Sequence, residues 1–413
     1  VTLLILLGPF MAPIAGAIAL ACHLSQQPIA MRGTHLQIFE PWGQGALRIV
    51  TDVRQWLGLI RLRSVSADKV ESLRVVYTDL LAEGTDRFFH PKATHCPVCS
   101  GEEFTRGFTL PDLYQGKPGR FTVVRCKKCN HRFQNPRLNS EGLSFYYRDF
   151  YDGIGEDSLD LIFGATRALY EDRVSLVKSV TSPRCWLDVG CGHGHLFGHV
   201  RGALPDTRLE GLDMGDGVDV GLARGWLDSA HKGSFPELSA GLSETYDVVS
   251  MCHYLEHTVD PRAELNAANE VLELGGHLLI EVPDPESVFA VLLGKWWMPW
   301  FQPQHLNFLS TVQMARLLRE AGFEPVEWHT GRANTANDFV LSFHIMVSHW
   351  AGRVDVPWKP ESTLFQRFRY QLIWIPGLLF VTVGAVLDKL IAPLARRFHH
   401  VSQYRVIARK IHN

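Results

Sequence analysis

The chain has 413 residues, 46% of them hydrophobic and 20% charged, with a formal net charge of −2 and eight cysteines. That length and apolar content suffice for two or three domains with a sizeable buried core. The nearly balanced charge excludes a chain-wide basic field for nucleic acid, and eight cysteines are too few for a disulfide scaffold in a chain of this size.

The first predicted element is an apolar N-terminal stretch. No Asp, Glu, Lys or Arg precedes Arg32, and residues 1–22 are long and apolar enough to cross a bilayer. Two prolines within the stretch, and the lack of a basic residue ahead of it, argue against an ordinary signal peptide. We expect residues 1–30 to contact a membrane, to pack as a buried helix or to have no role. Residues 46–84 have the apolar spacing of two short helices.

Residues 91–139 contain two Cys-x-x-Cys pairs. Cys96 and Cys99 form the first pair, and Cys126 and Cys129 form the second after 26 intervening residues. Thiolates two residues apart can point at one tetrahedral ion, so two such pairs supply a closed four-sulfur shell. We expect a structural Zn²⁺ ribbon, because a closed shell leaves no position for a substrate. Redox pairs or free thiols are the alternative. The ribbon also carries several basic side chains. We expect them to form a solvated face and not a contact with nucleic acid.

From about residue 160, short apolar runs alternate with helical stretches such as 262–273 and 311–321. The runs that predict strands are WLDV, RLEGLD, YDVVSM, HLLIEV, EPVEWH and, close to the C-terminus, QYRVIARK. Strands that alternate with helices predict a parallel sheet with crossover connections. We therefore expect an α/β domain with a doubly wound sheet.

The first of these strands leads into a glycine-rich turn, WLDVGCGHGHLF. Gly190, Gly192 and Gly194 alternate along it. Such a strand-to-helix turn lets the backbone and the helix N-terminus approach a ligand closely. The dinucleotide fingerprint requires a third glycine where His195 stands, and no Lys-Ser or Lys-Thr follows as in a P-loop. The pattern therefore disfavours a dinucleotide as the ligand of this turn and excludes a P-loop.

Two aspartates beside this turn indicate the ligand. Asp188 ends the first strand, where its carboxylate would repel a pyrophosphate but suit an ammonium group. Asp213 ends the second strand, 25 residues later, where a carboxylate can accept hydrogen bonds from both hydroxyls of a ribose. A nucleoside that carries a positive charge and no pyrophosphate meets both conditions, and S-adenosylmethionine is such a molecule.

Four motifs in order, LDVGCGHG, GLD, YDVVSMCHYLEHTVDP and LELGGHLLIEVPDP, resemble the class I S-adenosylmethionine-dependent methyltransferases over about residues 160–330. The resemblance implies a Rossmann-like sheet in which Asp188 lies beside the amino group of the cofactor and Asp213 holds its ribose. Ser234 stands where many relatives have an aspartate. The other cofactor contacts that the resemblance implies are Gly190, Gly192, Gly194, Met214, Ser234 and Cys252.

The ribbon and the segment NPRLNSEGLSFYYRDFY after it resemble a narrower group, the zinc-containing sugar methyltransferases. In that group a Tyr-x-Glu-His segment supplies catalytic groups, which implies His257 as general base with Glu256 and Tyr254 in support. Leu-Glu-His also occurs in methyltransferases that act on quinones, with a different role. His253 and His257, four residues apart, could instead form a metal pair. A second sugar-binding half is not evident, so O-methylation stands beside C-methylation.

An aromatic segment follows the strand HLLIEV, where class I enzymes usually place an acceptor lid. Trp296, Trp297, Trp300 and Phe301 lie there, close to His305. Sugars and flat rings both stack on aromatic faces, and a core cluster is the alternative. We expect His305 to be a second acid–base group or a structural histidine.

The segment 336–400 contains a further apolar stretch. Residues 372–387 carry no charge, arginines flank them, and Pro376–Gly377 interrupts them. This pattern predicts an interfacial helix or hairpin with basic anchors, or else helices that pack on the sheet. Membrane contact here would suit a lipid-linked acceptor.

Together these features predict a doubly wound Rossmann-like α/β methyltransferase with an N-terminal Zn²⁺ ribbon and hydrophobic helical additions. We expect methyl transfer to a small-molecule, sugar or lipid-linked saccharide acceptor, in the cytoplasm or at the inner face of the membrane. A quinone or lipid O-methyltransferase, a nicotinamide oxidoreductase, and a zinc-ribbon nucleic-acid or membrane adaptor are the alternatives. The expected parts are 1–90, the ribbon at 91–139, the cofactor domain at 140–335, the helical insertion at 336–400 and a closing strand at 401–413.

Overall fold

The computed structural model describes residues 67–149, 167–242, 246–330, 337–397 and 401–412. The chain divides into two units, residues 1–65 and 66–413, and every described residue belongs to the second. The apolar N-terminal stretch and the first of the two short predicted helices lie outside the described residues. The second predicted helix is confirmed as α3 (Ala67–Leu81).

The described chain alternates strands and helices from residue 167 onward. Its other helices are α4 (Ser140–Tyr147), α6 (Arg167–Val180), α7 (His195–Ala203), α8 (Gly217–Ala223), α9 (Phe235–Leu238), α10 (Pro261–Val271), α11 (Val288–Leu293), α12 (Thr311–Glu320), α13 (Asp338–Ala351) and α14 (Leu364–Arg397). Its strands are β1 (Phe104–Leu110), β2 (Phe121–Cys126), β3 (Arg132–Gln134), β4 (Cys185–Val189), β5 (Arg208–Asp213), β6 (Ser229–Lys232), β7 (Tyr246–Cys252), β8 (Leu272–Pro283), β9 (Asn307–Phe308), β10 (Phe323–His329) and β11 (Gln403–Lys410).

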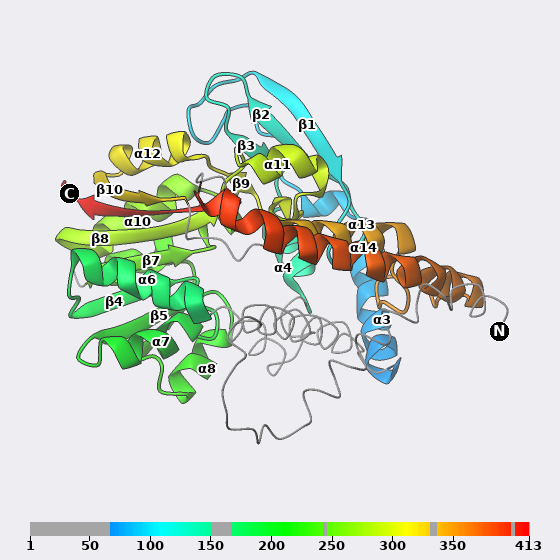
Figure 1. Cartoon of the computed structure of the whole chain (residues 1–413), viewed down its shortest axis with the longest axis horizontal. Helices are drawn as coiled ribbons and strands as arrows, with labels where there is room; N and C mark the ends of the chain where they lie inside the picture. The colour runs from blue at the N-terminus through cyan, green and yellow to red at the C-terminus, as the bar shows by residue number, and fades with distance from the viewer. Residues whose placement is uncertain (1–66, 150–166, 243–245, 331–336, 398–400, 413) are drawn as a thin grey trace, which may run out of the picture. The chain divides into compact units, whose positions relative to one another are not determined.

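The larger sheet has the strand order β10-β11-β8-β7-β4-β5-β6 (Figure 1). Strands β4 to β8 run parallel, and β11 is antiparallel to both of its neighbours, β8 and β10. The chain runs outward from β4 to β6 and then returns to the other side of β4 with β7. In an open α/β sheet, ligands bind outside the carboxyl ends of the strands where the order reverses in this way. A ligand site is therefore expected after Val189 and Cys252.

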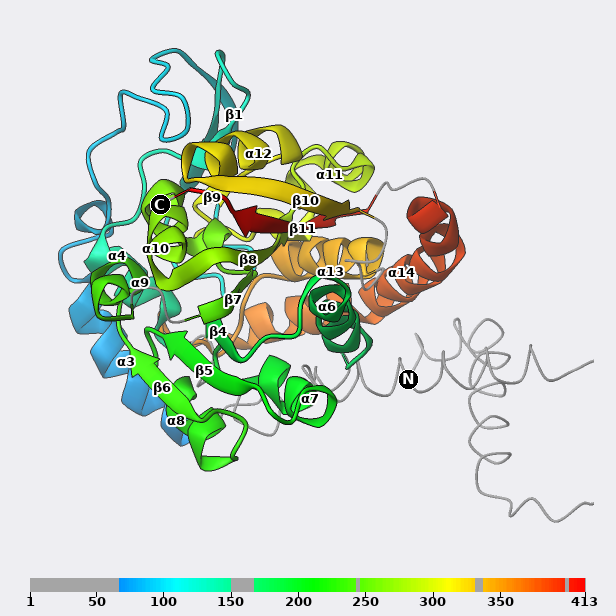
Figure 2. The same ribbon diagram turned by 90° about the vertical axis from the view of Figure 1, so that its left-hand side faces the viewer.

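Hydrophobic side chains cover both faces of this sheet. In β4, Trp186 packs on the same face as α6 and α7, whereas Leu187 packs with α10 and α12. The same alternation recurs in β8, where Leu279 packs on the side of Trp186 and Leu278 on the side of Leu187. Figure 2 shows α6 and α10 on opposite sides of the sheet. Burial on both faces is typical of a parallel sheet between two helical layers, so the predicted doubly wound architecture is confirmed.

The predicted strand runs correspond to β4, β5, β7, β8, β10 and β11. The remaining strand of this sheet, β6, corresponds to no predicted run. This strand lies at the edge of the sheet, has four residues and contains no fully buried side chain. It has no apolar run, so periodicity gives no sign of it.

The second sheet has the order β1-β2-β3-β9 and holds the ribbon. Its first three strands come from residues 104–134, but β9 comes from the segment after the aromatic residues. Arg132 of β3 pairs with Phe308, and Phe133 pairs with Asn307. Backbone hydrogen bonds therefore tie the ribbon to the segment that follows β8.

Helix α14 is continuous for 34 residues, so the predicted interruption at Pro376–Gly377 is wrong. A proline removes one backbone hydrogen bond and crowds the preceding turn. Here close packing against α13 offsets that cost: a Cβ on Gly377 would lie 2.5 Å from Cγ1 of Val347. The two helices form an antiparallel hairpin between β10 and β11, within the predicted insertion.

Candidate active site

The turn after β4 is built from glycines in left-handed conformations. Gly190, Gly192 and Gly194 have φ values of 74°, 53° and 76°, a region that other residues rarely adopt. A Cβ on Gly190 would lie 2.6 Å from the ring of Tyr254, whereas Gly192 faces open space. Helix α7 begins at His195, the residue that replaces the third glycine of the dinucleotide fingerprint. The turn therefore presents bare backbone to an open space, as a ligand-binding turn requires.

Asp213 lies beside this turn, at the end of β5. One carboxylate oxygen accepts a hydrogen bond from the backbone N–H of Gly192, and the other from that of Gly215, both at 2.9 Å. Each oxygen of a carboxylate has a second lone pair, so both can still accept a hydroxyl. The arrangement fits the predicted contact with a ribose.

Two other predicted cofactor contacts lie close to Asp213. Met214 follows it directly and is 68% exposed, with its side chain free to cover a flat ring. Gly233 donates its N–H to the carbonyl oxygen of Asp213 at 3.0 Å, which places Ser234 next to the same strand end. Their contact with an adenine stays a prediction.

Asp188 is buried at the end of β4. Its Oδ1 accepts a hydrogen bond from the hydroxyl of Ser250 on β7 at 2.5 Å. Burial raises the pKa of Asp188 to about 7, although the Ser250 hydroxyl opposes the rise. Cys252 ends β7, and burial raises the pKa of its thiol to about 12, so it is a neutral group at this site. A cation bound beside Asp188 would favour the ionised form of this carboxyl.

The segment after β7 turns back towards the sheet. The hydroxyl of Tyr254 donates to Glu264 on α10 at 2.9 Å, while its ring covers Gly190. Glu256 is buried, and its Oε1 lies 3.1 Å from Nδ1 of His253. Tyr254 thus contacts the glycine turn through its ring, whereas its predicted catalytic hydroxyl is engaged by a carboxylate.

His257 lies on the same turn and contacts α4 and the segment before β9. Its Nδ1 is 2.6 Å from the hydroxyl of Tyr147 on α4 and 3.2 Å from the carbonyl oxygen of Gln304. A carbonyl only accepts, so this contact favours a proton on Nδ1 and leaves Nε2 as the basic nitrogen. Burial lowers the pKa of His257, which keeps the ring neutral near pH 7. A neutral imidazole with a free Nε2 is what a general base requires.

His305 packs edge-on against His257, with the ring centroids 4.5 Å apart. Its Nδ1 lies 2.7 Å from the carbonyl oxygen of Pro299, and burial lowers its pKa to about 3. The ring is therefore neutral and fixed. Its role as a second acid–base group stays a prediction, and its packing against His257 is also that of a structural residue.

The predicted pair of His253 and His257 does not come together as metal ligands. The donor atoms that do lie within 4.8 Å of one another belong to Glu256, His257 and His305. His253 turns the other way because two carboxylates hold it, Glu256 at Nδ1 and Glu281 at Nε2, each at 3.1 Å. The spacing of four residues does not bring the two histidines to one face, because the segment is not an α-helix.

A network of buried charges supports this turn. Glu281 on β8 takes a paired contact from Arg173 on α6, at 2.6 and 3.1 Å, and another from Arg405 on β11. Burial disfavours the charge on His253, but the hydrogen bonds with Glu256 and Glu281 outweigh it and raise its pKa to about 9. The same contacts keep Glu256 ionised, with its pKa lowered despite burial. The charges alternate in sign, as buried charges must.

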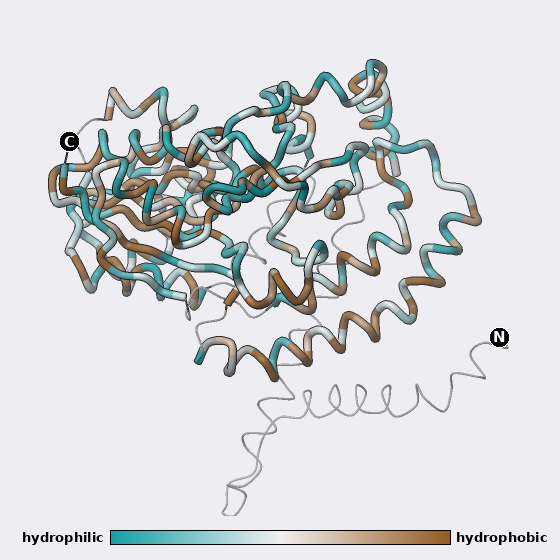
Figure 3. Tube along the Cα trace, turned by 90° about the horizontal axis from the view of Figure 1, so that it is seen from above, coloured by the Kyte–Doolittle hydropathy of each residue, from teal (hydrophilic) through white to brown (hydrophobic). Residues whose placement is uncertain are grey.

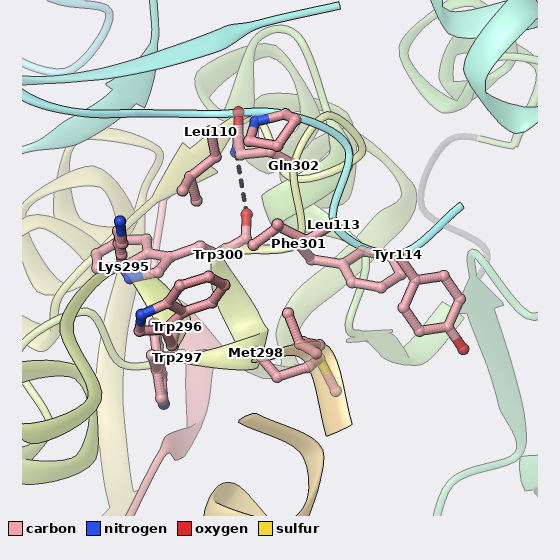
Figure 4. A pocket seen from close by; sticks show the side chains of 12 residues that line it. Leu110, Leu113, Tyr114, Lys295, Trp296, Trp297, Met298, Trp300, Phe301 and Gln302 are labelled. Carbon is pink, nitrogen blue, oxygen red and sulfur yellow. Dashed lines mark hydrogen bonds between the residues drawn. The ribbon is translucent and has the colours of Figure 1, made fainter. Parts of the chain in front are cut away.

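The aromatic segment is mostly core. Trp297 and Trp300 are buried and pack edge-to-face, with ring centroids 5.0 Å apart, whereas Trp296 is more exposed and faces α13. Figure 4 shows these rings around a pocket that extends towards Leu113 and Tyr114. The pocket has only about 10 Å³ of space, which is room for one water molecule. The segment is thus a filled cluster that positions His305, not an open acceptor cavity.

The four predicted cysteine ligands come together in the ribbon. Their Sγ atoms all lie within 4.8 Å of one another, with 3.7 Å between Cys96 and Cys129 and 3.5 Å between Cys99 and Cys126. The two turns match: Ser100 donates its N–H to the carbonyl of Cys96, and Asn130 donates to that of Cys126, both at 2.9 Å. Both donors have a positive φ.

Comparison with known proteins agrees with this geometry. Residues 165–327 match the family described as "Methyltransferase domain". A ubiquinone biosynthesis O-methyltransferase of Marinobacter nauticus is 30% identical over 167 residues, which cover 37% of this chain and 67% of that protein. The chain belongs to the class I S-adenosylmethionine-dependent methyltransferases.

Other similar proteins bear comparable names. The ubiquinone biosynthesis O-methyltransferase of Dinoroseobacter shibae is 30% identical over 155 residues, 34% of this chain. The chain spans about 60% of the length of that protein and of several others with the same name. A solved S-adenosylmethionine-dependent methyltransferase from Archaeoglobus fulgidus is 18% identical, with a TM-score of 0.38 over 61% of this chain and 98% of its own.

Membership of this family implies S-adenosylmethionine as the methyl donor. The family membership disagrees with the nicotinamide oxidoreductase and with the non-enzymatic adaptor considered above. The residues of the structure also fit the donor. A bare glycine turn borders an open space at Gly192, with a carboxyl on each side of it, the buried Asp188 and the partly exposed Asp213.

Several residues of the site are not evident from the sequence motifs. Glu281 could have been found from the sequence, because it is the one charged residue inside the apolar run HLLIEV. Arg405 stands in a similar run. Tyr147 lies in the segment that resembles the sugar methyltransferases, but nothing local connects it with His257. Arg173 is a surface-type residue on an amphipathic helix and carried no signal.

Proposed function

We propose that the methyltransferase transfers the methyl group of S-adenosylmethionine to an acceptor hydroxyl, with His257 as general base. The observation that carries the proposal is the state of His257. Its ring is neutral, its Nδ1 is held by Tyr147 and Gln304, and it follows the strand end beside the glycine turn. Among the residues that the structure describes, no partner occupies its Nε2.

The donor would be held by the residues around the glycine turn. Asp188 would face its ammonium group, and Asp213 would accept from the ribose hydroxyls. Gly190, Gly192 and Gly194 would border its methionine part, with Met214, Ser234 and Cys252 around the rest. The bound donor supplies an already activated methyl group on a sulfonium, so little covalent help from the chain is needed.

The acceptor oxygen would lose its proton to Nε2 of His257 as the new carbon–oxygen bond forms. Glu256 is ionised and close to this ring, and it would stabilise the imidazolium that results. His253, held by Glu256 and Glu281, would fix the carboxylate of Glu256 in place. The tyrosine Tyr254 would shape the glycine turn through its ring instead of taking part through its hydroxyl.

Two acceptor classes are supported by different observations. The curated relatives, which are named ubiquinone biosynthesis O-methyltransferases, favour O-methylation, and from this we infer a phenol of the quinone-precursor type as acceptor. The four-cysteine ribbon, together with the contact of Tyr147 to His257, favours a saccharide hydroxyl, because the resemblance to sugar methyltransferases includes that ribbon. We place the phenolic acceptor first.

Methyl transfer tests the proposal directly. The chain is incubated with S-adenosylmethionine labelled in the methyl group, together with a catechol, a monophenol, or a free or nucleotide-linked hexose. We expect label in the catechol as an acid-stable methyl ether. The variant His257→Ala, with S-adenosylhomocysteine binding intact, should transfer little label. Label in the hexose alone would show that the acceptor is a saccharide and not a phenol. Label bound to carbon or nitrogen in any product would contradict the hydroxyl acceptor.

We further propose that the four cysteines hold a structural Zn²⁺. A tetrahedral shell with Zn–S bonds of about 2.3 Å puts sulfurs about 3.8 Å apart, close to the observed spacing. Gly101 supports the site, because a Cβ there would lie 3.2 Å from Sγ of Cys126. Titration of the thiols with a mercurial should release one Zn²⁺ per chain, and Cys99→Ser should lower both metal content and melting temperature. Thiols that are fully reactive in a metal-free, stable chain would contradict the proposal.

A further inference from the structure

The exposed side of α14 is apolar along its length. Figure 3 shows the helix with mostly hydrophobic colouring. Phe365 is 72% exposed and Leu379 62%. Spacings of three and four residues put the exposed residues on one side of the helix, over about 38 Å at 1.5 Å per residue. The apolar stripe consists of Phe365, Phe368, Leu372, Ile375, Leu379 and Val383, and it extends to Leu390.

The opposite side of α14 is fixed to α13. Gly377 and Gly384 let the two helices approach: a Cβ on Gly384 would lie 3.0 Å from the backbone of Phe339. Asp388 is buried and accepts hydrogen bonds from the N–H groups of Phe339 and Val340, both at 2.9 Å. By length and composition Leu364–Ile391 could cross a membrane. A spanning position would separate it from α13 and leave these groups unpaired, so the helix is better suited to lie along a surface.

A basic pocket lies where α13 ends and α14 begins. It has about 310 Å³ of space, and Arg353, Lys359 and Arg369 line it. Burial lowers the pKa of Lys359, and the charges of Arg353 and Arg369 lower it further, so the potential in the pocket is positive. Glu361 also lines the pocket, but it lies 3.6 Å from Arg367, which compensates its charge.

The charges of the helix fit an anionic surface. Residues 370–387 carry none, whereas arginines precede them and Lys389, Arg396 and Arg397 follow. The one acidic residue of α14, Asp388, faces α13. Two copies that packed stripe to stripe in antiparallel fashion would bring basic ends together. An apolar stripe between basic ends is instead typical of helices in the interface of anionic lipids.

We propose that α14 lies in the plane of an anionic lipid bilayer, with its apolar stripe among the acyl chains and the basic pocket around the phosphate of a lipid headgroup. This inference goes beyond the proposed function and does not depend on it.

Packing contacts connect the α13–α14 hairpin to the candidate active site. Phe339 at the start of α13 packs against Phe289, with ring centroids 5.7 Å apart, and the hydroxyl of Ser402 contacts both Asp338 and the indole N–H of Trp297. The same aromatic segment holds His305 against His257. Docking would therefore bring the acceptor side of the site close to molecules that reside in the bilayer.

Vesicle co-sedimentation of the full chain tests the proposal. We expect binding to vesicles that contain phosphatidylglycerol, and much weaker binding to phosphatidylcholine alone. Lys359→Gln should weaken binding to the anionic vesicles about five-fold, as expected for one cation near a charged surface. Leu379→Ser with Val383→Ser should weaken binding to both vesicle types, by about ten-fold for each side chain. Lys178→Gln on α6 and Val312→Ser on α12 are the matched controls, and unchanged melting temperatures show that the variants fold.

Several results would overturn the proposal. Equal binding to both vesicle types, unaffected by Lys359→Gln, would show that the pocket does not bind a lipid headgroup. Protein that stays in the vesicle membrane after alkaline carbonate extraction would indicate that α14 spans the bilayer instead of lying in its plane. A dimer without lipid that Leu379→Ser dissociates, with no vesicle binding, would identify a second copy as the occupant. Stabilisation by inorganic phosphate without vesicle binding would indicate a soluble anion. None of these measurements involves methyl transfer, so their failure leaves the proposed function untouched.

Discussion

The two sides of the candidate active site are assembled in different ways. The donor side, with Asp188, the glycine turn and Asp213, is formed by consecutive strand ends of one sheet, 25 residues apart in sequence. The acceptor side brings His257 together with Tyr147 from α4 and with Gln304 and His305 from the aromatic segment. The donor side is therefore set by the fold of one domain, whereas the acceptor side depends on how three separate segments pack.

This difference predicts separable effects of mutation. Changes on the donor side should alter the binding of S-adenosylhomocysteine, and changes on the acceptor side should alter turnover while binding is retained. A change that moved both quantities together would break the distinction.

The largest effect is expected for the base. His257→Ala should reduce kcat by about 10²–10⁴-fold, the usual contribution of a positioned general base. The affinity for S-adenosylhomocysteine, measured by calorimetry, should stay within a few-fold of the original. His329→Ala on β10 removes another partly buried histidine and should leave kcat unchanged. Turnover by His257→Ala at the original rate would exclude this residue as the base.

The next largest effect belongs to the donor side. Asp213→Ala removes both acceptors for the ribose and also the partner of the Gly192 N–H, so affinity for S-adenosylhomocysteine should fall about 100-fold or more. Asp219→Ala, on the exposed side of α8, provides the control. Calorimetric affinity that is unchanged in Asp213→Ala would show that the ribose lies elsewhere.

The same contrast explains what could be predicted from the sequence. On the donor side the turn, both aspartates and the strands that bear them follow from local patterns, and the structure has them as predicted. On the acceptor side, the contact of Tyr147 with His257 spans 110 residues, and no periodicity reports such a contact. Trp297 and Trp300 were open to two interpretations because a stacking surface and a core cluster have the same composition. Pro376 misled the helix prediction because its cost is local, while the packing of α14 on α13 is not.

Titration of Asp188 gives a smaller and pH-dependent effect. Its pKa is raised from 3.8 to about 7 in the chain without ligand, and an ammonium group binds best to the ionised form. Affinity for S-adenosylhomocysteine should therefore rise about ten-fold between pH 6 and pH 8, the change expected for one carboxyl with this pKa. In Asp188→Asn this dependence should disappear. Equal slopes in the two proteins would mean that the titrating group is not Asp188.

The stability of the ligand-free chain should change in the opposite direction. Because the folded-state pKa of Asp188 is raised, its contribution to stability is fully present below pH 3.8 and is lost as the pH rises through about 7. Binding of an ammonium ligand reverses this loss. The increase in melting temperature caused by S-adenosylhomocysteine should thus be larger at pH 8 than at pH 6, and Asp188→Asn should make the two increases equal.

The smallest effect tests the contact between α4 and the base. Tyr147→Phe removes one hydrogen bond at Nδ1 of His257 while Gln304 keeps the other, so kcat should fall only about five-fold. Without the phenolic oxygen the imidazolium is less stable, and the acidic limb of the pH–kcat profile should move to lower pH. Tyr146→Phe is a neighbouring control, since its hydroxyl donates to the carbonyl of Pro118 and not to the site. A tyrosine with only a structural role would lower the melting temperature and leave the acidic limb in place. A shifted limb with an unchanged affinity for S-adenosylhomocysteine would show that Tyr147 of α4 tunes the acceptor side and leaves the donor side unchanged.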